Sequence, residues 1–252
     1  MKPRVTIITI VKDSKHSIER TIQSLIEQEF NDFQYIVIDG KSSDGTVDII
    51  KKYSTLVDVF ISEFDNGTSD AFNKALDFIK GDYVIWLAAD DCFGSKFLSH
   101  AVTELEKSNA DLFWGSMTMY SAIGQCSGRI NQNHDIESCL KNGRGLNFPS
   151  MMIKTKYLKL IGGLDLSVQY CNDIEWLLRA YSIQKPKHIF SNKVSIHRDD
   201  DGKVSKNFRA AALEMIKVYR QYSYSILPLL KNLIIREVIN IKTILNGKKI
   251  KW

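Results

Sequence analysis

Short apolar runs alternate with amphipathic segments along the first 115 residues. The run at 5–11 is rich in β-branched residues and predicts a buried strand, and apolar residues then recur at helical spacing over 14–28. The same alternation predicts strands at 35–38, 59–62 and 83–87, and helices at 47–53 and 71–79. Continuous apolar strands that alternate with helices are typical of a parallel sheet covered on both faces. We therefore predict a doubly wound, mostly parallel, Rossmann-like α/β unit over residues 1 to about 115.

The regular alternation ends after a further predicted strand at 111–114. Five glycines divide the next segment into short pieces of mixed character: Gly115, Gly124, Gly128, Gly143 and Gly145. Helical spacing returns at 174–181 and 208–222. We expect this irregular half to elaborate on the sheet rather than repeat it. The predicted domain covers 1–224, with halves at 1–115 and about 116–224, and a separate C-terminal segment follows at 225–252.

The composition is that of a soluble globular protein with a large core, at 44% hydrophobic and 25% charged residues over 252 positions. It excludes disordered, collagen-like and disulfide-framework proteins. The four cysteines are far apart and form neither a CxxC pair nor a zinc-ligand spacing with histidine, which predicts reduced thiols. We find no signal-peptide pattern at the start and no run of the roughly 18–20 apolar residues that a membrane span needs. We expect a cytoplasmic protein whose membrane contact, if it has one, is peripheral and at the inner face of the cell membrane.

The positive charge of the chain is concentrated at its C-terminus. The formal net charge is +5, and residues 225–252 account for all of it with six basic residues and one acidic residue. A nucleic-acid binder would carry a basic face on its folded domain. The neutral first 224 residues therefore argue against a nucleic-acid partner.

Carboxylates follow two of the predicted strands. Asp39 comes directly after the second strand, and Asp90 and Asp91 come after the fourth. Ligands of open α/β sheets bind beyond the carboxyl ends of the strands, and a divalent cation would neutralise two adjacent carboxylates. Asp90 and Asp91 could equally open a loop and cap the next helix. Because the chain has no GxGxxG or GxxxxGK[ST] loop, a diphosphate would have to be held through a metal ion.

Five segments, in chain order, resemble the successive motifs of family-2 glycosyltransferases, in particular the bacterial branch that builds O-antigens, capsules and exopolysaccharides. They are TIIT at 6–9, VIDGKSSDGT at 37–46, SEFDNG at 62–67, DAFNK at 70–74 and LAADD at 87–91. The resemblance resumes with GGLD at 162–165 and DIEWLLR at 173–179. Each segment alone is weak evidence for the family, but five segments in the family's order are specific for it. The resemblance implies a GT-A fold, a nucleotide-sugar donor, a divalent metal ion and an inverting transfer.

The resemblance also implies a donor site. Thr9 and Asp39 match positions that hold the nucleotide base and ribose, and Asp70, Asn73 and Lys74 match positions that contact the donor. For Asp70 the alternative is a plain helix cap before the segment at 71–79.

The same resemblance implies a metal site. Asp90 would contact ribose or sugar hydroxyls, and Asp91 would hold Mn²⁺ or Mg²⁺ across the diphosphate. Ala88 departs from the family, which often has Asn or Asp there. His197, after a strand-like segment at 193–196, is a candidate further metal ligand; the alternative is a surface histidine in a polar loop.

An inverting transfer needs a base that takes the proton of the acceptor hydroxyl. Asp173 matches the catalytic carboxylate of the family and stands just before a predicted helix, where it could instead be an N-cap. Glu175 is the rival for the base, and motif register favours Asp173. Trp176 could line the acceptor cleft, since sugars stack on indole rings.

The C-terminal segment predicts an amphipathic helix with basic residues crowded at its end. Its apolar positions recur at steps of three and four: Leu227, Leu230, Ile234, Val238, Ile241 and Leu245. Such a helix could lie in an anionic membrane interface, where the acceptor could be a lipid-linked sugar. The same pattern would serve for packing on the domain or on a second copy in a homodimer. The sequence does not favour membrane contact over such packing.

We interpret the chain as a metal-dependent, inverting hexosyl- or N-acetylhexosaminyl-transferase. It would move a sugar from a UDP-linked donor to a hydroxyl of a growing bacterial surface glycan. The alternative is a non-catalytic glycan-binding or scaffolding protein with the same fold, which would have no need of both Asp91 and Asp173. A sugar nucleotidyltransferase would carry a glycine-rich loop after its first strand, and residues 11–15 contain no glycine.

Overall fold

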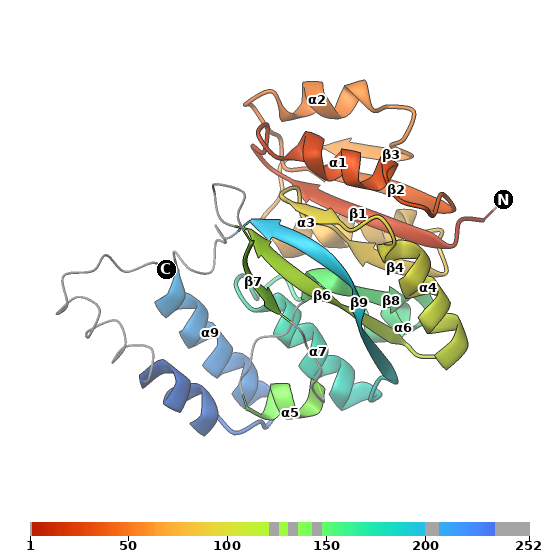
Figure 1. Ribbon diagram of the computed structural model, residues 1–252. Helices are drawn as coiled ribbons and strands as arrows, with labels where there is room; N and C mark the ends of the chain where they lie inside the picture. The colour runs from red at the N-terminus through yellow and green to blue at the C-terminus, as the bar shows by residue number, and fades with distance from the viewer. Residues whose placement is uncertain (1, 121–125, 131–135, 143–147, 200–206, 235–252) are drawn as a thin grey trace.

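The computed structural model describes residues 2–120, 126–130, 136–142, 148–199 and 207–234 (Figure 1). Its strands are β1 (Val5–Val11), β2 (Phe33–Asp39), β3 (Val59–Ser62), β4 (Tyr83–Trp86), β5 (Asp91–Phe93), β6 (Leu112–Tyr120), β7 (Cys126–Ile130), β8 (Met151–Lys154) and β9 (His188–Asp199). Its helices are α1 (Ile18–Ile26), α2 (Thr46–Lys52), α3 (Thr68–Ala75), α4 (Phe97–Ser108), α5 (Ile136–Lys141), α6 (Thr155–Ile161), α7 (Asn172–Ile183) and α9 (Phe208–Gln221), with 3-10 turns at Leu76–Phe78 and Phe148–Ser150.

The first half of the chain is the predicted parallel unit. Strands β3, β2, β1 and β4 lie side by side in this order and all run parallel, with Val5 opposite Phe33. Strands β1 and β3 have the predicted bounds. Helix α1 is shorter than the predicted helix at 14–28 at both ends. The backbone amides of Ser14 and Lys15 bond the side chains of Thr46, the first residue of α2, and of Asp44, in the loop before it, so both residues belong to the loop after β1.

The second half extends the same sheet with mixed strand directions, so the expected elaboration is confirmed. Strand β8 runs antiparallel between β4 and β6, β9 pairs parallel with β6, and β5 pairs antiparallel with β9. Strand β6 continues six residues beyond the predicted 111–114, to Tyr120. Polar residues interrupt the apolar pattern there, but pairing with β9 keeps the backbone extended.

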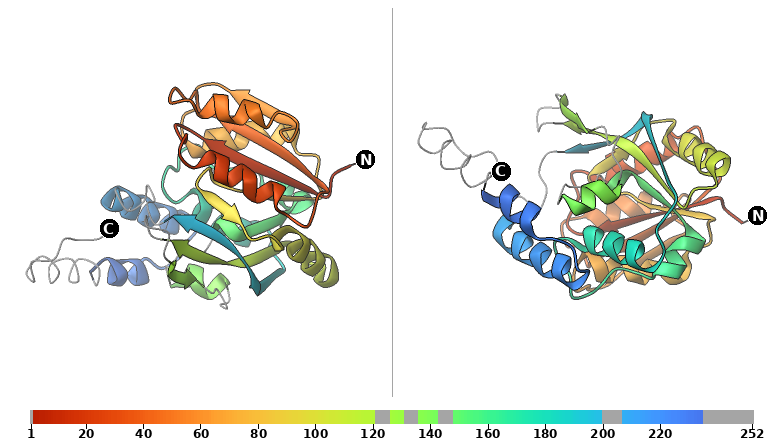
Figure 2. Two further views of the ribbon diagram at one scale, coloured as in Figure 1. Left: turned by 45° about the horizontal axis from the view of Figure 1, so that its top comes forward. Right: turned by 90° about the horizontal axis from the view of Figure 1, so that it is seen from below.

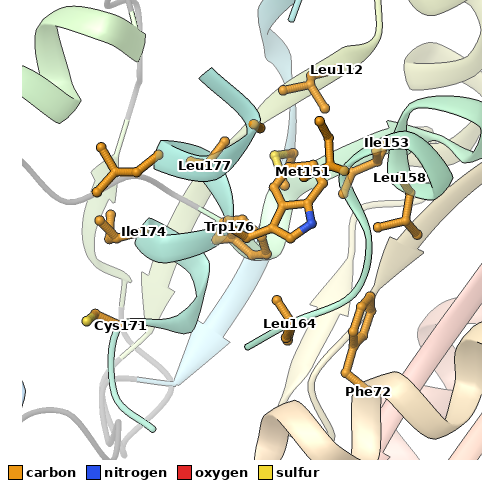
Figure 3. Packing of buried hydrophobic residues seen from close by; sticks show 14 of the residues in the cluster. Phe72, Leu112, Met151, Ile153, Leu158, Leu164, Cys171, Ile174, Trp176 and Leu177 are labelled. Atoms are coloured by element: carbon orange, nitrogen blue, oxygen red, sulfur yellow. The ribbon is translucent and has the colours of Figure 1, made fainter. Parts of the chain in front are cut away.

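Helices cover both faces of the sheet. Helices α1, α2 and α4 bury apolar residues against one face, and α3, α6, α7 and α9 pack on the other around Trp176. Trp176 is 1% exposed and its Nε1 donates to the Gly162 carbonyl over 2.8 Å. Figure 3 shows its indole beside buried side chains of β8 and α6, among them Met151, Ile153 and Leu158. The prediction that Trp176 lines the acceptor cleft is therefore wrong: its ring belongs to the core.

The chain continues after α9 as a short helix at 227–234. Both views of Figure 2 place α9 and this helix at the periphery, on the side of α7. Leu229 is buried in the same core as Trp176. No helix in the described ranges has the length and apolar character needed to cross a bilayer. Residues 235–252 of the predicted C-terminal helix lie outside the described residues.

Candidate active site at the carboxyl edge of the sheet

Asp39 ties the loops after β2 and β3 together. Its buried carboxylate accepts hydrogen bonds from the amide and hydroxyl of Ser42 and from the hydroxyl of Ser62, the last over 2.6 Å. Ser42 also accepts from the backbone amide of Asp13, which follows β1. One carboxylate at a strand end thus orders three neighbouring loops. These bonds leave Asp39 fully buried and committed to the protein itself.

Gly40 lets the loop after β3 approach the loop after β2. A Cβ atom at Gly40 would lie 2.3 Å from Oδ2 of Asp65, so a larger residue would force the two loops apart. Asp65 in turn accepts from the amide of Gly67, whose φ of +108° starts α3. The sequence around Gly40 and Gly67 therefore sets the position of α3 behind the candidate donor site.

The donor-contact candidates on α3 have different surroundings. Asp70 lies in the first turn and accepts from the backbone amide of Asn66, whereas Gly67 is the N-cap, so the interpretation of Asp70 as the cap residue is wrong. Lys74 pairs with Glu63 over 2.8 Å and donates to the Phe64 carbonyl over 2.7 Å. The hydrogen bond to Glu63 raises the pKa of Lys74. The side chains of Asp70 and Lys74 thus lie at the carboxyl edge, beside the loop after β3.

Thr9 and Asn73 make bonds that hold the fold. Thr9 is fully buried, and its hydroxyl accepts from the Tyr35 hydroxyl over 3.0 Å. The side-chain amide of Asn73 donates to the Leu164 carbonyl and accepts from the Leu164 amide, each over 2.8 Å. A Cβ at Gly163 would meet Oδ1 of Asn73 at 2.3 Å, which explains the second glycine of the GGLD motif. The structure thus shows a packing role for both side chains.

Glu175, the rival base, is enclosed in a charged network. It is 1% exposed and pairs with Arg179 through both oxygens, at 2.9 and 3.0 Å. Tyr222, just beyond α9, donates to it over 2.5 Å. Arg179 donates further to the carbonyls of Ile161 and Gly163. Glu175 therefore links α7 to the GGLD segment and to the end of α9.

Asp173 lies on the first turn of α7 and is half-buried. Cys171 is the N-cap, so the interpretation of Asp173 as the cap is wrong, although its Oδ1 accepts from the Ile174 amide over 2.7 Å. The neighbouring Asn172 donates to the hydroxyl of Ser69 on α3 over 3.0 Å. The start of α7, which carries Asp173, is thus held against the start of α3, next to the loop after β3.

Glu214 fixes the backbone that leads into Asp173. From α9, its carboxylate accepts three backbone amides, those of Gln169 over 2.8 Å, Tyr170 over 2.7 Å and Cys171 over 3.0 Å. Burial alone would raise the pKa of Glu214, but these hydrogen bonds outweigh burial and hold the pKa below its usual value. Sequence reasoning missed this residue. A usable signal was that Glu214 is the only acidic residue between 203 and 236.

The lowered pKa of Glu214 predicts a pH-dependent contribution to stability. A carboxyl group with a lower pKa in the folded than in the unfolded state stabilises the fold above its unfolded pKa, and this stabilisation is lost as the pH falls through the folded pKa. We expect Glu214→Gln to lower the free energy of unfolding by about 1–3 kcal/mol at pH 7. The difference in the free energy of unfolding between variant and wild type should narrow as the pH falls below 4.5, the ordinary pKa of a glutamate side chain. Urea unfolding across this range measures it, with the exposed Glu27→Gln as control; a gap that does not change with pH would contradict the prediction.

Asp90 and Asp91 follow β4 at the carboxyl edge. Asp90 is half-buried, and its backbone carbonyl accepts from Arg20 of α1. Asp91 is fully buried and opens β5, so the alternative that the pair caps the next helix is wrong, since Lys96 is the N-cap of α4. His197 lies opposite Cys92, and Asp91 lies opposite Arg198. Opposed residues share a face of the sheet, so Asp91 and His197 lie on opposite faces, and the structure does not bring them together as ligands of one metal ion. His197 lies within β9, so the alternative of a histidine in a polar loop is wrong. The His197 ring instead lies 5.3 Å from that of Tyr120, and burial lowers its pKa.

Asp91, a buried carboxylate that follows the parallel strands, is the candidate ligand for a divalent cation shared with a diphosphate. In the described part of the chain, no group of three or more His, Cys, Asp and Glu side chains is arranged to hold a metal ion. A cation such as Mg²⁺ is commonly held by one or two carboxylates together with substrate phosphates and water, rather than by a cage made of protein alone. The Asp91 carboxylate would supply an oxygen ligand of this kind.

Comparisons with known proteins show the family of the chain. The family model described as "Glycosyl transferase family 2" matches residues 6–155. TuaG of Bacillus subtilis, named for a glycosyltransferase role in teichuronic acid biosynthesis, is 36% identical over 128 residues, 49% of each chain. WfgD of Escherichia coli, a UDP-Glc:α-D-GlcNAc-diphosphoundecaprenol β-1,3-glucosyltransferase, is 26% identical over 54% of this chain and 56% of its own. The matches thus span about half the length of these two relatives.

The solved structures identify the fold. The mannosyltransferase PcManGT of Pyrobaculum calidifontis, in complex with GDP-Man and Mn²⁺, superposes with a TM-score of 0.67 at 18% identity, over 88% of this chain and 64% of its own. The predicted GT-A fold is therefore confirmed. The motifs at the carboxyl edge, the fold and the match over more than half of the residues lead to one assignment: the chain belongs to glycosyl transferase family 2.

Proposed function

We propose that the chain is a metal-dependent, inverting glycosyltransferase that moves a hexosyl or N-acetylhexosaminyl group from a UDP-linked donor to a hydroxyl of a bacterial surface glycan. The proposal rests on the different surroundings of the two carboxylates in the first turn of α7. Glu175 is buried and bonded to Arg179 and Tyr222, whereas Asp173 is half-exposed at the helix start. A carboxylate that water can reach, held beside the donor-side loops, is suited to act as a base.

In the proposed reaction Asp173 accepts the proton of the acceptor hydroxyl as its oxygen attacks the anomeric carbon. The new bond forms on the face opposite the departing diphosphate, so the bond from the anomeric carbon to the diphosphate oxygen breaks with inversion. A divalent cation held by Asp91 would stabilise the negative charge that develops on the leaving diphosphate, and Asp90 would contact hydroxyls of the donor. Glu214 fixes the backbone before Asp173, so the base would be preorganised.

The donor and acceptor classes are proposed from the relatives. WfgD takes a UDP-sugar and acts on a lipid diphosphate-linked sugar, and the name of TuaG places it in the synthesis of a cell-wall polymer. A UDP-sugar donor and a growing surface glycan, of the O-antigen or wall-polymer type and carried on a lipid, fit both. The proposed location is the cytoplasm, at the inner face of the membrane.

A donor screen tests this function. The full chain is incubated with UDP-, GDP- and dTDP-sugars in the presence of Mn²⁺, and donor hydrolysis and the thermal unfolding midpoint are followed. We expect UDP-sugars to be hydrolysed slowly and to raise the midpoint. Binding of glycans without donor turnover would instead favour the non-catalytic alternative.

Donor binding is predicted to require a divalent cation, because Asp90 and Asp91 cannot approach a diphosphate without neutralisation of charge. UDP should raise the unfolding midpoint of the wild type with Mn²⁺ and fail to do so with EDTA. Asp91→Asn should remove this shift when compared with its own midpoint without ligand, and Asp77→Asn, on an exposed turn, should keep it. UDP binding that EDTA does not weaken would contradict the metal assignment.

A further inference from the structure

The helix at 227–234 exposes an apolar face. Leu227, Leu230 and Ile234 are 73%, 37% and 64% exposed, at steps of three and four, while Leu229 faces inward and is buried. Ile226 and Leu229 pack on the core, so the helix is anchored and cannot simply turn over. Three large apolar side chains on one helix face therefore point into solvent.

The outer face of α9 is basic. Arg209, Lys217 and Arg220 occupy exposed positions along it, together with Leu213, which is 70% exposed. The acidic residue of α9, Glu214, turns inward to the amides before α7. The exposed side of this helix thus combines three positive charges with a large apolar side chain.

The positive charge of the chain is concentrated in the part that contains α9 and the helix at 227–234. Residues 203–252 hold eleven basic and two acidic residues, a formal net charge of +9, which leaves −4 for residues 1–202. A second copy that docked symmetrically through the same face would bring a like-charged segment against it, which is unfavourable. A soluble polyanion would match the charge but would leave the exposed leucines in water. An anionic bilayer matches both features.

We propose that α9 and the helix at 227–234, together called the C-terminal surface, dock on an anionic lipid bilayer. Leu213, Leu227, Leu230 and Ile234 enter the interface between headgroups and acyl chains, and the basic residues contact the headgroups. This docking does not depend on the proposed reaction, although it would bring a lipid-linked acceptor to the enzyme.

Vesicle flotation of the full chain tests the proposal. The vesicles are phosphatidylcholine alone or phosphatidylcholine with phosphatidylglycerol, at low and high salt. We expect the wild type to bind the anionic vesicles at least about tenfold more tightly than the neutral ones, and less tightly as salt rises. Truncation near Tyr224 is unsuitable, because it would remove Ile226 and Leu229 from the core.

Point variants separate the two components of docking. The triple variant Leu227→Gln, Leu230→Gln, Ile234→Gln and the double variant Lys217→Glu, Arg220→Glu should each lower binding to anionic vesicles by about tenfold or more. Helix α6 offers matched controls in the exposed Leu160→Gln and in Lys156→Glu with Lys159→Glu, which should bind as the wild type does.

Three outcomes would overturn the proposal. They are a wild type that ignores anionic vesicles, control variants that lose as much binding as the test variants, and a stable dimer in light scattering that the triple variant dissolves. Unchanged unfolding midpoints would show that the variants are folded. Because no donor is present in the assay, absence of sugar transfer would leave this result unaffected.

Discussion

Replacing Asp173 by Asn is expected to lower the rate of sugar transfer by about 100-fold or more, while donor affinity changes little. The substitution keeps the shape of the side chain and removes its basicity, and a base contributes in the transition state rather than in the complex with the donor. The bond from the Ile174 amide to Oδ1 can be kept by the amide oxygen of Asn, so the start of α7 should remain intact. Initial rates at saturating donor, with UDP titrations in parallel, measure the two effects separately.

Two results would reassign this role. Transfer by Asp173→Asn at nearly the wild-type rate would exclude Asp173 as the base. A simultaneous loss of donor affinity would show that Asp173 contacts the donor instead. Asp77→Asn, which changes a carboxylate on an exposed turn, is the matched control and should transfer normally.

Replacing Glu175 by Ala is expected to lower the free energy of unfolding by about 2–4 kcal/mol. The change leaves the Arg179 guanidinium, whose side chain is 22% exposed, without its carboxylate and leaves the Tyr222 hydroxyl without its acceptor. Tyr222→Phe removes one bond of the same network and should cost about 1 kcal/mol. Urea unfolding of the single and double variants gives both values and their coupling.

The comparison of Asp173 with Glu175 distinguishes base from scaffold. If Glu175→Ala unfolds at the wild-type urea concentration yet cannot transfer sugar, Glu175 acts in the chemistry and the network with Arg179 is incidental. If instead the variant is destabilised and keeps part of its activity at low temperature, its role is structural. The second result is the one we expect.

The fold was predictable where its signals are local. Apolar runs of four to seven residues and helical spacing between them were sufficient for β1 to β4 and α1 to α3. Strand β5 has only three residues and begins with a charged one, and β8 leads directly into α6 without a turn, so neither is bounded as the predicted strands are. The spacing of apolar residues in α4 does indicate a helix and was overlooked.

The site was predictable as a set of positions but not as a set of contacts. The sequence indicates that Asp39, Asp90 and Asp173 follow strands or start helices at one edge. That Asp39 is enclosed by Ser42 and Ser62, or that Asn73 clamps Leu164, depends on the approach of loops that are distant in the chain. Whether Glu175 or Asp173 is open to solvent is likewise a property of packing, because both stand in the same turn of one helix.

Glu214 ties the segment before Asp173 to α9, the helix that we propose docks on a bilayer. Its carboxylate joins α9 directly to the three amides before α7, two residues or more ahead of Asp173 in the chain. A bilayer bound to α9 would therefore set the height of the reaction centre above the lipid headgroups. In the proposed reaction, acceptors whose reactive hydroxyl stands at that height would be favoured over shorter or longer lipid-linked glycans.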